Sequence, residues 1–158
     1  MFTDVDYMKM ALAEAESAFK KDEVPVGAVV VYEGKVLASG HNSPISRHDP
    51  SAHAEMLALR QAAETIGNYR LMGAELYVTL EPCIMCAGAI IQARLARLVY
   101  GASDPKCGAV ASLYNVLTDN MLNHQVAVTG GILKDECGEI ISRFFRGKRV
   151  VSAAVAVK

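Results

Sequence analysis

Two cysteines, Cys83 and Cys86, lie three residues apart in the stretch TLEPCIMCAGAI, which covers residues 79–90. A pair at this spacing can be a redox couple, a disulfide or half of a metal site. Zinc prefers thiolate and imidazole ligands, so two cysteines can supply two corners of a tetrahedron. The remaining cysteines, Cys107 and Cys137, are far apart and form no second close pair. A site with one further protein ligand keeps a position open for water, which is the catalytic arrangement.

A candidate third ligand is His53, in the sequence His-Ala-Glu at the start of a predicted helix. Between His53 and Cys83 the pattern predicts one helix, a turn and one strand, so both helix starts can meet at one edge of a sheet. Ligands gather beyond the carboxyl ends of strands in α/β sheets. Glu55 is two residues from His53, and at the first turn of a helix both side chains can point toward the same site.

The elements that would position these residues follow from hydrophobic periodicity. Thr3 and Asp6 resemble a capping box, and a helix of about 17 residues is expected after Thr3. Two strands are expected on either side of Glu33-Gly34, which is a hairpin signal. After a polar loop over 41–52, the pattern predicts helix 52–66, strand 74–80, helix 84–94, strand 95–101, a short helix 113–120, strand 124–131 and helix 134–149.

Strands that alternate with helices predict a sheet sandwiched between helices, and the initial hairpin makes that sheet mixed. No repeat or linker divides the chain, so we expect one domain over residues 1–158. Its core would cover about 7–149, and residues 150–158 would form an apolar tail.

Composition narrows the class of protein. The 158 residues are 52% hydrophobic and 21% charged, which is typical of a globular chain. No apolar run approaches the roughly 18–20 residues of a membrane span. No secretory signal opens the chain, so we expect a cytoplasmic protein, where a close cysteine pair binds metal or catalyses more often than it forms a disulfide. The net charge of −1 excludes a global nucleic-acid signature, but SRFFRGKR, residues 142–149, is a local basic patch.

The pattern H-x-E followed by P-C-x-x-C resembles the signature of the zinc-dependent nucleobase deaminases. Carried over to this sequence, the resemblance implies that His53, Cys83 and Cys86 bind one zinc ion per subunit. It also implies that Glu55 is the general acid/base.

Longer blocks extend the resemblance from about Tyr7 to Arg149. They include EVPVGAV, GHNSPISRHDPSAHAE, NYRLMGAELYVTLEPCIMCAGAI and RLARLVYGASDPK, and they are similar to the bacterial tRNA-specific adenosine deaminases. The resemblance implies a cytidine-deaminase-like α/β fold with three α/β/α layers, in which a mixed sheet of about five strands has helices on both faces. It implies a hydrolase that converts the wobble adenosine of a tRNA anticodon, typically of an arginine tRNA, to inosine. It further implies a homodimer that binds the anticodon stem-loop.

The same resemblance implies substrate contacts. Asn42 would hydrogen-bond the purine and ribose, because an amide can pair with both a donor and an acceptor. Asp104 could accept from a 2′-OH, which is present in RNA and absent from DNA. The expected substrate-binding residues are Asn42, Ala54, Arg70, Asp104, Lys106, Phe145 and Arg149.

Two other functions stay open at this point. A deaminase of a free nucleobase or nucleotide, of the guanine or cytosine type, would share the zinc chemistry, but it would not need the basic, aromatic segment 142–149. A zinc-folded RNA-binding module without activity would have no use for a general base at Glu55.

Overall fold

The structure, a computed structural model, describes residues 1–156. Its helices are α1 (Asp4–Lys20), α2 (Pro44–Arg47), α3 (Ala54–Ile66), α4 (Ile84–Gln92) and α5 (Lys134–Ala156). Its strands are β1 (Gly27–Tyr32), β2 (Lys35–His41), β3 (Glu75–Leu80), β4 (Arg97–Ala102) and β5 (Ala127–Thr129). They form one sheet in the order β2-β1-β3-β4-β5, which is antiparallel up to β3 and parallel from there on.

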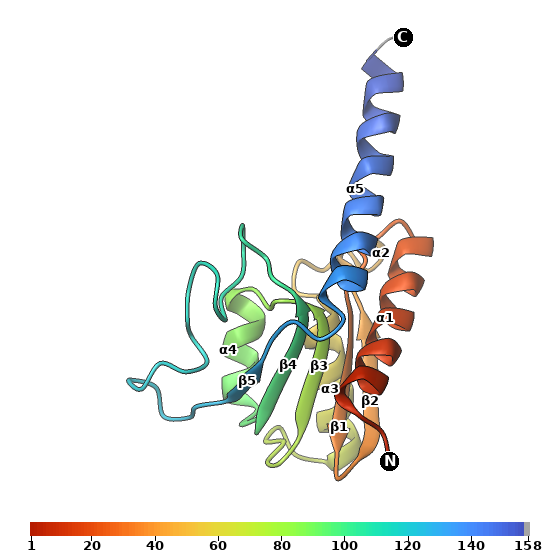
Figure 1. The fold of residues 1–158 in the computed structure, drawn as a ribbon. Helices are drawn as coiled ribbons and strands as arrows, with labels where there is room; N and C mark the ends of the chain where they lie inside the picture. Colours follow the sequence, from red (N-terminus) through yellow and green to blue (C-terminus); the bar gives the residue numbers. More distant parts are fainter. Residues whose placement is uncertain (157–158) are drawn as a thin grey trace.

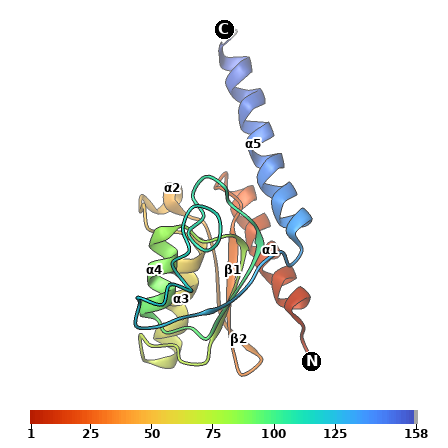
Figure 2. The same cartoon turned by 60° about the vertical axis from the view of Figure 1, so that its left-hand side comes forward.

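The sheet is the middle of three layers. Helices α1 and α5 cover one face, and α3 and α4 cover the other (Figures 1 and 2). Alternate strand residues serve the two faces: Val29 and Tyr77 pack with the α1 side, whereas Val30, Leu76 and Val78 pack with the α3 and α4 side. The predicted mixed five-stranded sheet with helices on both faces is confirmed.

Local sequence signals determine the start of α1 and the turn between β1 and β2, as expected. The Thr3 hydroxyl accepts from the Asp6 N–H at 3.3 Å, and the Asp6 carboxylate accepts from the Thr3 N–H at 2.8 Å. This capping box starts α1 at Asp4. Glu33 and Gly34 both have positive φ angles, of 50° and 74°, and form the two-residue turn between β1 and β2.

Strand direction brings three loops to one edge of the sheet. Because β1 is antiparallel to both β2 and β3, and β4 is parallel to β3, the carboxyl ends of β2, β3 and β4 lie together. Asn42 follows β2, Cys83 follows β3 and Asp104 follows β4. The edge is therefore where the predicted site residues converge.

The helix predicted over 113–120 was wrong. This stretch is a loop in which the Leu113 N–H donates to the Gly108 carbonyl at 2.9 Å and the Val116 N–H to the Ala109 carbonyl at 3.1 Å. These bonds reach back to an earlier loop instead of closing helical turns. The prediction also missed the short α2 within the polar loop, and the last strand is shorter than expected.

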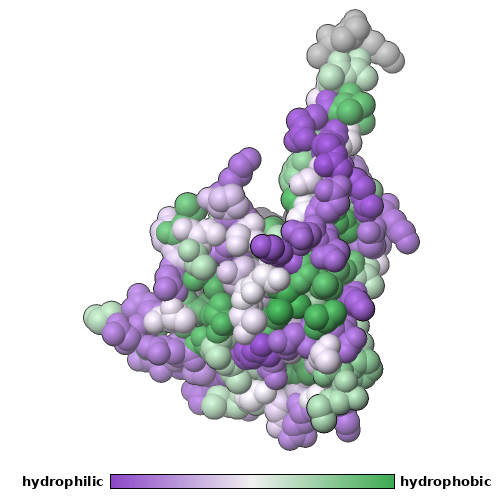
Figure 3. Space-filling model, viewed as in Figure 1, coloured by the Kyte–Doolittle hydropathy of each residue, from purple (hydrophilic) through white to green (hydrophobic). Residues whose placement is uncertain are grey.

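The final helix is longer than predicted. It continues past Arg149 to Ala156, so the apolar tail is a helix extension, and its residues 157–158 lie outside the described part of the chain. The carboxyl-terminal part of α5 leaves the body (Figure 1), with hydrophilic residues along it and hydrophobic ones near its end (Figure 3). Within the described residues, the search for a helix long and apolar enough to cross a membrane finds none.

An ion-pair network closes the opposite edge of the sheet. Arg97 donates to the Asp4 carboxylate at 2.7 and 3.0 Å and to Glu75 at 3.1 Å. Tyr77 also donates to Asp4, at 2.9 Å. The hydrogen bond from Arg97 is the main cause that lowers the pKa of Asp4 below its usual value. The network joins α1 to β3 and β4 far from the site.

We therefore expect Asp4→Asn to destabilise the protein at neutral pH but not in acid. Because the folded pKa of Asp4 is lowered, its contribution is fully present above the unfolded pKa of about 3.9 and disappears as pH falls through the folded value. The free energy of unfolding in urea should fall by about 1 kcal/mol at pH 7, and the difference from wild type should shrink below pH 4. A difference that is equal at pH 3 and pH 7 would contradict this assignment.

Candidate metal centre and substrate cavity

Three potential ligand atoms form a compact triangle at the carboxyl edge of the sheet. The Cys83 Sγ and the Cys86 Sγ each lie 3.6 Å from the His53 Nδ1, and all three atoms are within 4.8 Å of one another. Tetrahedral zinc with bonds of about 2.3 Å to sulfur and about 2.0 Å to nitrogen separates its ligand atoms by roughly 3.5 Å. The distances and the donor set therefore fit a zinc ion with one position left for water.

Two helix starts place these ligands. His53 is the N-cap of α3 and Cys83 the N-cap of α4, and neither side chain caps its own helix. Both side chains are therefore directed to the triangle, next to helix N-termini that favour negative charge. A hydrogen bond from the Cys86 thiol holds the pKa of Cys83 well below its usual range. The same hydrogen bond raises the pKa of the Cys86 thiol, so Cys83 is the member of the pair that is poised as a thiolate.

Glu55 lies beside the triangle, in the first turn of α3. Its side chain is buried, with the residue 4% exposed, and burial raises the pKa of its carboxyl to about 7. A carboxyl with such a pKa can both accept and donate a proton near neutral pH. Geometry thus brings together the four residues of the H-x-E and P-C-x-x-C motifs, as the sequence analysis expected.

Asn42 connects two of the converging loops. Its side-chain carbonyl accepts from the backbone N–H of Ala54 at 2.8 Å, and both residues are buried. This bond fixes the start of α3, on which His53 and Glu55 lie. Since the carbonyl oxygen is used in this way, the amide nitrogen is the atom of Asn42 that can donate to a substrate.

A cavity of about 700 Å³ lies between the loop after β4 and the middle of α5, residues 141–149. Four of the predicted substrate-binding residues line it: Asp104, Lys106, Phe145 and Arg149. The Phe145 side chain is 42% exposed, so its ring is accessible. The cavity combines a stacking surface with cations and a carboxylate, which is a suitable lining for a nucleotide.

Arg70 does not join this group. It follows α3 and precedes β3, so it lies at the opposite ends of both elements from the metal triangle. Its guanidinium donates to the hydroxyl of Tyr69 at 3.0 Å and lies over the same ring at 5.4 Å. The lengths of α3 and β3 therefore separate Arg70 from the edge of the sheet where the metal triangle lies.

Sequence reasoning missed two buried carboxylates that hold the loops around the site. Glu23 accepts from the backbone N–H of Ser46 at 2.8 Å, at the start of α2. Glu81, between β3 and Cys83, accepts from the loop after β4. Burial opposes ionisation of Glu81, but these hydrogen bonds outweigh it and lower the pKa of its carboxyl. The sequence signal that could have identified Glu81 is its position, as an acidic residue directly after the apolar run of β3.

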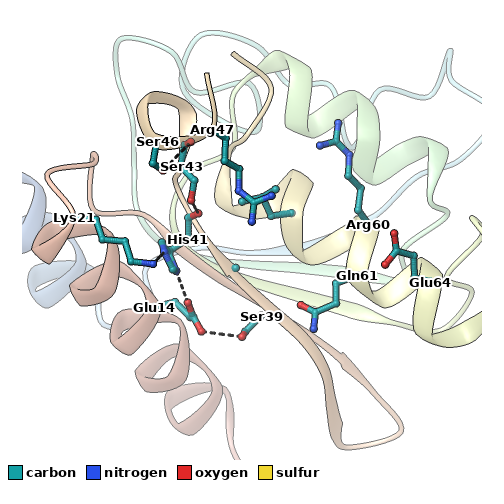
Figure 4. Close-up of a pocket in the computed structure, with 12 residues that line it drawn as sticks. Glu14, Lys21, Ser39, His41, Ser43, Ser46, Arg47, Arg60, Gln61 and Glu64 are labelled. Atoms are coloured by element: carbon teal, nitrogen blue, oxygen red, sulfur yellow. Dashed lines mark hydrogen bonds and ion pairs between the residues drawn. The ribbon is translucent and has the colours of Figure 1, made fainter. Parts of the chain in front are cut away.

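A further cavity, of about 600 Å³, lies between α1, β2, α2 and α3 (Figure 4). On one wall His41 contacts Glu14 through Nδ1 at 2.7 Å and Lys21 through Nε2 at 3.1 Å. Arg47 reaches into the space from α2, and Arg60 lies on the wall made by α3 (Figure 4). The Glu14–His41–Lys21 chain ties α1 to the end of β2, next to Asn42.

Comparisons with known proteins agree with this geometry. A family model described as MafB19-like deaminase matches residues 2–149. A tRNA-specific adenosine deaminase of Bacillus subtilis (strain 168) is 48% identical over 149 residues, which are 94% of this chain and 92% of the relative. The span 2–149 that the family model matches includes every residue of the site.

Solved structures give the same result. One, from a study of A-to-I editing by tRNA:A34 deaminases at the wobble position, has a TM-score of 0.82 and 48% identity, and the match covers 85% of this chain and 97% of the other. A guanine deaminase from Bacillus subtilis is less similar, with a TM-score of 0.62 and 36% identity over 65% of this chain and 66% of the other. The chain belongs to the MafB19-like deaminase family and, by its identity to these relatives, to the tRNA-specific adenosine deaminases.

Proposed function

We propose that this protein hydrolyses the wobble adenosine of a tRNA anticodon to inosine and releases ammonia. The observation that carries the proposal is the triangle of His53, Cys83 and Cys86 beside the buried Glu55. The substrate is inferred from two relatives at 48% identity, one named a tRNA-specific adenosine deaminase and one described in a study of tRNA:A34 deaminases. An arginine tRNA with the anticodon ACG is the substrate that we propose.

The residues of the site have distinct roles in this reaction. His53, Cys83 and Cys86 would hold one zinc ion per subunit. When it is bound, zinc lowers the pKa of a coordinated water molecule to about 7. Glu55 accepts a proton from the attacking water and delivers it to N1 of adenine. It then takes the remaining proton from the new hydroxyl on C6 and gives it to the amino group, so the C6–N bond breaks, ammonia leaves, and adenosine and water have become inosine and ammonia. The raised pKa of Glu55 suits both transfers.

The remaining site residues hold the RNA. The amide nitrogen of Asn42 donates to the purine and ribose, beside Ala54, whose backbone it fixes. Asp104 and Lys106 bind the sugar and phosphate near the extruded nucleotide, and Phe145 stacks on a loop base. An anticodon loop suits such a site because its bases are single-stranded and cost little to unstack.

Arg149 is proposed to contact a phosphate, and Arg149→Ala tests this contact. We expect the variant to bind the anticodon stem-loop about five- to tenfold more weakly, and to lower the slope of log K against log salt by about 0.7. Arg143→Ala is the matched control, because Arg143 is on the same helix but pairs with Glu16 at 3.0 Å. Fluorescence anisotropy at several salt concentrations measures both quantities. If both variants changed the affinity and the salt slope equally, the assignment of Arg149 as a phosphate contact would be wrong.

A homodimer is proposed from the exposed face of α4. The helix is almost entirely apolar, and Ile84 is 59% exposed on it, with Met85, Gly88 and Ala89 half-buried. An apolar surface of this kind is typical of an interface. Light scattering should give twice the mass of one chain, and Ile84→Glu should shift it toward one chain.

The function is tested by incubating the protein with an arginine tRNA transcript that carries an ACG anticodon and measuring inosine by nucleoside digestion. A transcript with guanosine at the wobble position is the control. Free adenosine, cytidine and guanine are assayed in parallel. Inosine at the wobble position supports the proposal, whereas turnover of a free base alone would support the free-nucleobase alternative.

A further inference from the structure

Glu81 is a buried charge with an unusual number of hydrogen-bond partners from one loop. The residue is 2% exposed and lies between the end of β3 and Pro82. Its carboxylate accepts from the backbone N–H groups of Asp104 at 3.1 Å, Val110 at 3.1 Å, Ala111 at 2.9 Å and Ser112 at 3.0 Å. It also accepts from the Ser112 hydroxyl. The single carboxylate therefore gathers both ends of the segment 104–112.

This segment has no helix or strand of its own, so its shape depends on such bonds. The Ala109 N–H donates to the Pro82 carbonyl at 2.9 Å, next to the Glu81 contacts. Gly108 lies so close to Glu81 that a Cβ at this position would clash with the carboxylate. The loop therefore surrounds the Glu81 side chain, and its conformation depends on the hydrogen bonds to that carboxylate.

The same loop presents the residues that line the substrate cavity. Asp104, held through its N–H by Glu81, accepts in turn from the N–H groups of Lys106 at 3.1 Å and Cys107 at 3.2 Å. The bonds run in series from the buried carboxylate to the tip of the loop. The tip faces Phe145 and Arg149 across the cavity of about 700 Å³.

We propose that Glu81 is a positioning residue that sets RNA affinity by holding the loop 104–112 in its binding conformation, without touching the RNA. The inference rests on the proposed function, since that function assigns RNA to the cavity. A loop ordered before binding loses less conformational freedom when the ligand arrives. If the loop adopted this conformation only about one tenth of the time, the apparent dissociation constant would rise about tenfold.

Glu81→Gln tests the proposal with little change of shape. One carboxylate oxygen becomes an NH₂ group, which faces backbone N–H donors and cannot accept from them. We expect the dissociation constant of a labelled anticodon stem-loop, measured in a Glu55→Ala background without turnover, to rise about tenfold. In the otherwise wild-type enzyme, KM should rise similarly while kcat changes by less than about twofold. Amide hydrogen exchange at residues 110–112 should accelerate.

Two further variants separate positioning from general stability. Glu75→Gln alters a carboxylate at the other end of the same strand, where it pairs with Arg97, and should lower stability without changing RNA affinity. Ser112→Ala removes one of the bonds to Glu81 and should weaken RNA binding in the same direction but less. If Glu81→Gln does not fold, the RNA dissociation constant of Ser112→Ala tests the proposal instead.

Several outcomes would overturn the inference. One is faster exchange at residues 110–112 with an unchanged RNA dissociation constant. Another is loss of zinc, or of kcat with KM unchanged, because Glu81 would then act on the metal centre instead. If wild-type protein bound no RNA and made no inosine, the proposed function itself would fail, while slow exchange at residues 110–112 would still report a held loop.

Discussion

Glu55→Ala is expected to reduce inosine formation at least about a thousandfold while the protein keeps its zinc and its fold. The reason is a separation of roles in the geometry. The metal triangle consists of atoms from His53, Cys83 and Cys86, and Glu55 contributes none of them. Without the carboxylate, the site loses the group that is proposed to move the proton from water to the ring nitrogen. Glu55 is 4% exposed, so bulk solvent is a poor substitute for its carboxylate.

The measurement combines three readings on one preparation. Single-turnover inosine formation gives the rate, metal analysis gives the zinc content, and urea unfolding gives the stability, which should change by less than about 2 kcal/mol. Glu64→Ala is the control, because Glu64 is an exposed acid on the same helix. A Glu55→Ala protein with full activity would show that the proton route is wrong. Loss of zinc would show that Glu55 supports the metal instead.

The grouping of His53, Cys83 and Cys86 could be predicted from the sequence because these residues are close in the chain to strong local signals. His53 precedes a clear helix, and Cys83 follows a clear strand, so the two motifs fall at helix starts. Strand direction then brings those starts to one edge of the sheet, because β2 and β3 are each antiparallel to β1. The triangle of ligand atoms follows from these local features without any detail of packing.

The parts that could not be predicted depend on contacts between distant segments. The role of Glu81 arises from donors 23 to 31 residues later in the chain, and no local pattern encodes them. Most residues of the stretch 113–120 are weak helix formers, and bonds to the Gly108 and Ala109 carbonyls replace the helical ones. Arg70 looked suitable as a cation near a motif, but the directions of α3 and β3 carry it to the far edge.

Removal of one metal ligand is expected to have an equally large effect by a different route. Cys86→Ser keeps the size of this buried side chain but replaces a soft thiolate with a hydroxyl, which zinc binds poorly. We expect the zinc content to fall from one ion per chain to less than about a tenth, and inosine formation to disappear with it. The loss should extend to stability, because a bound ion at a thousand times its dissociation constant stabilises the folded state by about 4 kcal/mol.

Cys107→Ser is the matched control, since Cys107 is an exposed thiol outside the triangle and should leave zinc content and stability unchanged. A chelator provides the same test without mutation: it should lower the melting temperature and activity of wild type, and added zinc should restore both.

The Glu55→Ala and Cys86→Ser experiments together distinguish the roles within the site. Glu55→Ala should be inactive with metal bound, whereas Cys86→Ser should be inactive because the metal is lost. Retention of zinc by Cys86→Ser would mean that His53 and Cys83 recruit a ligand other than Cys86, and the assignment of the triangle would have to change.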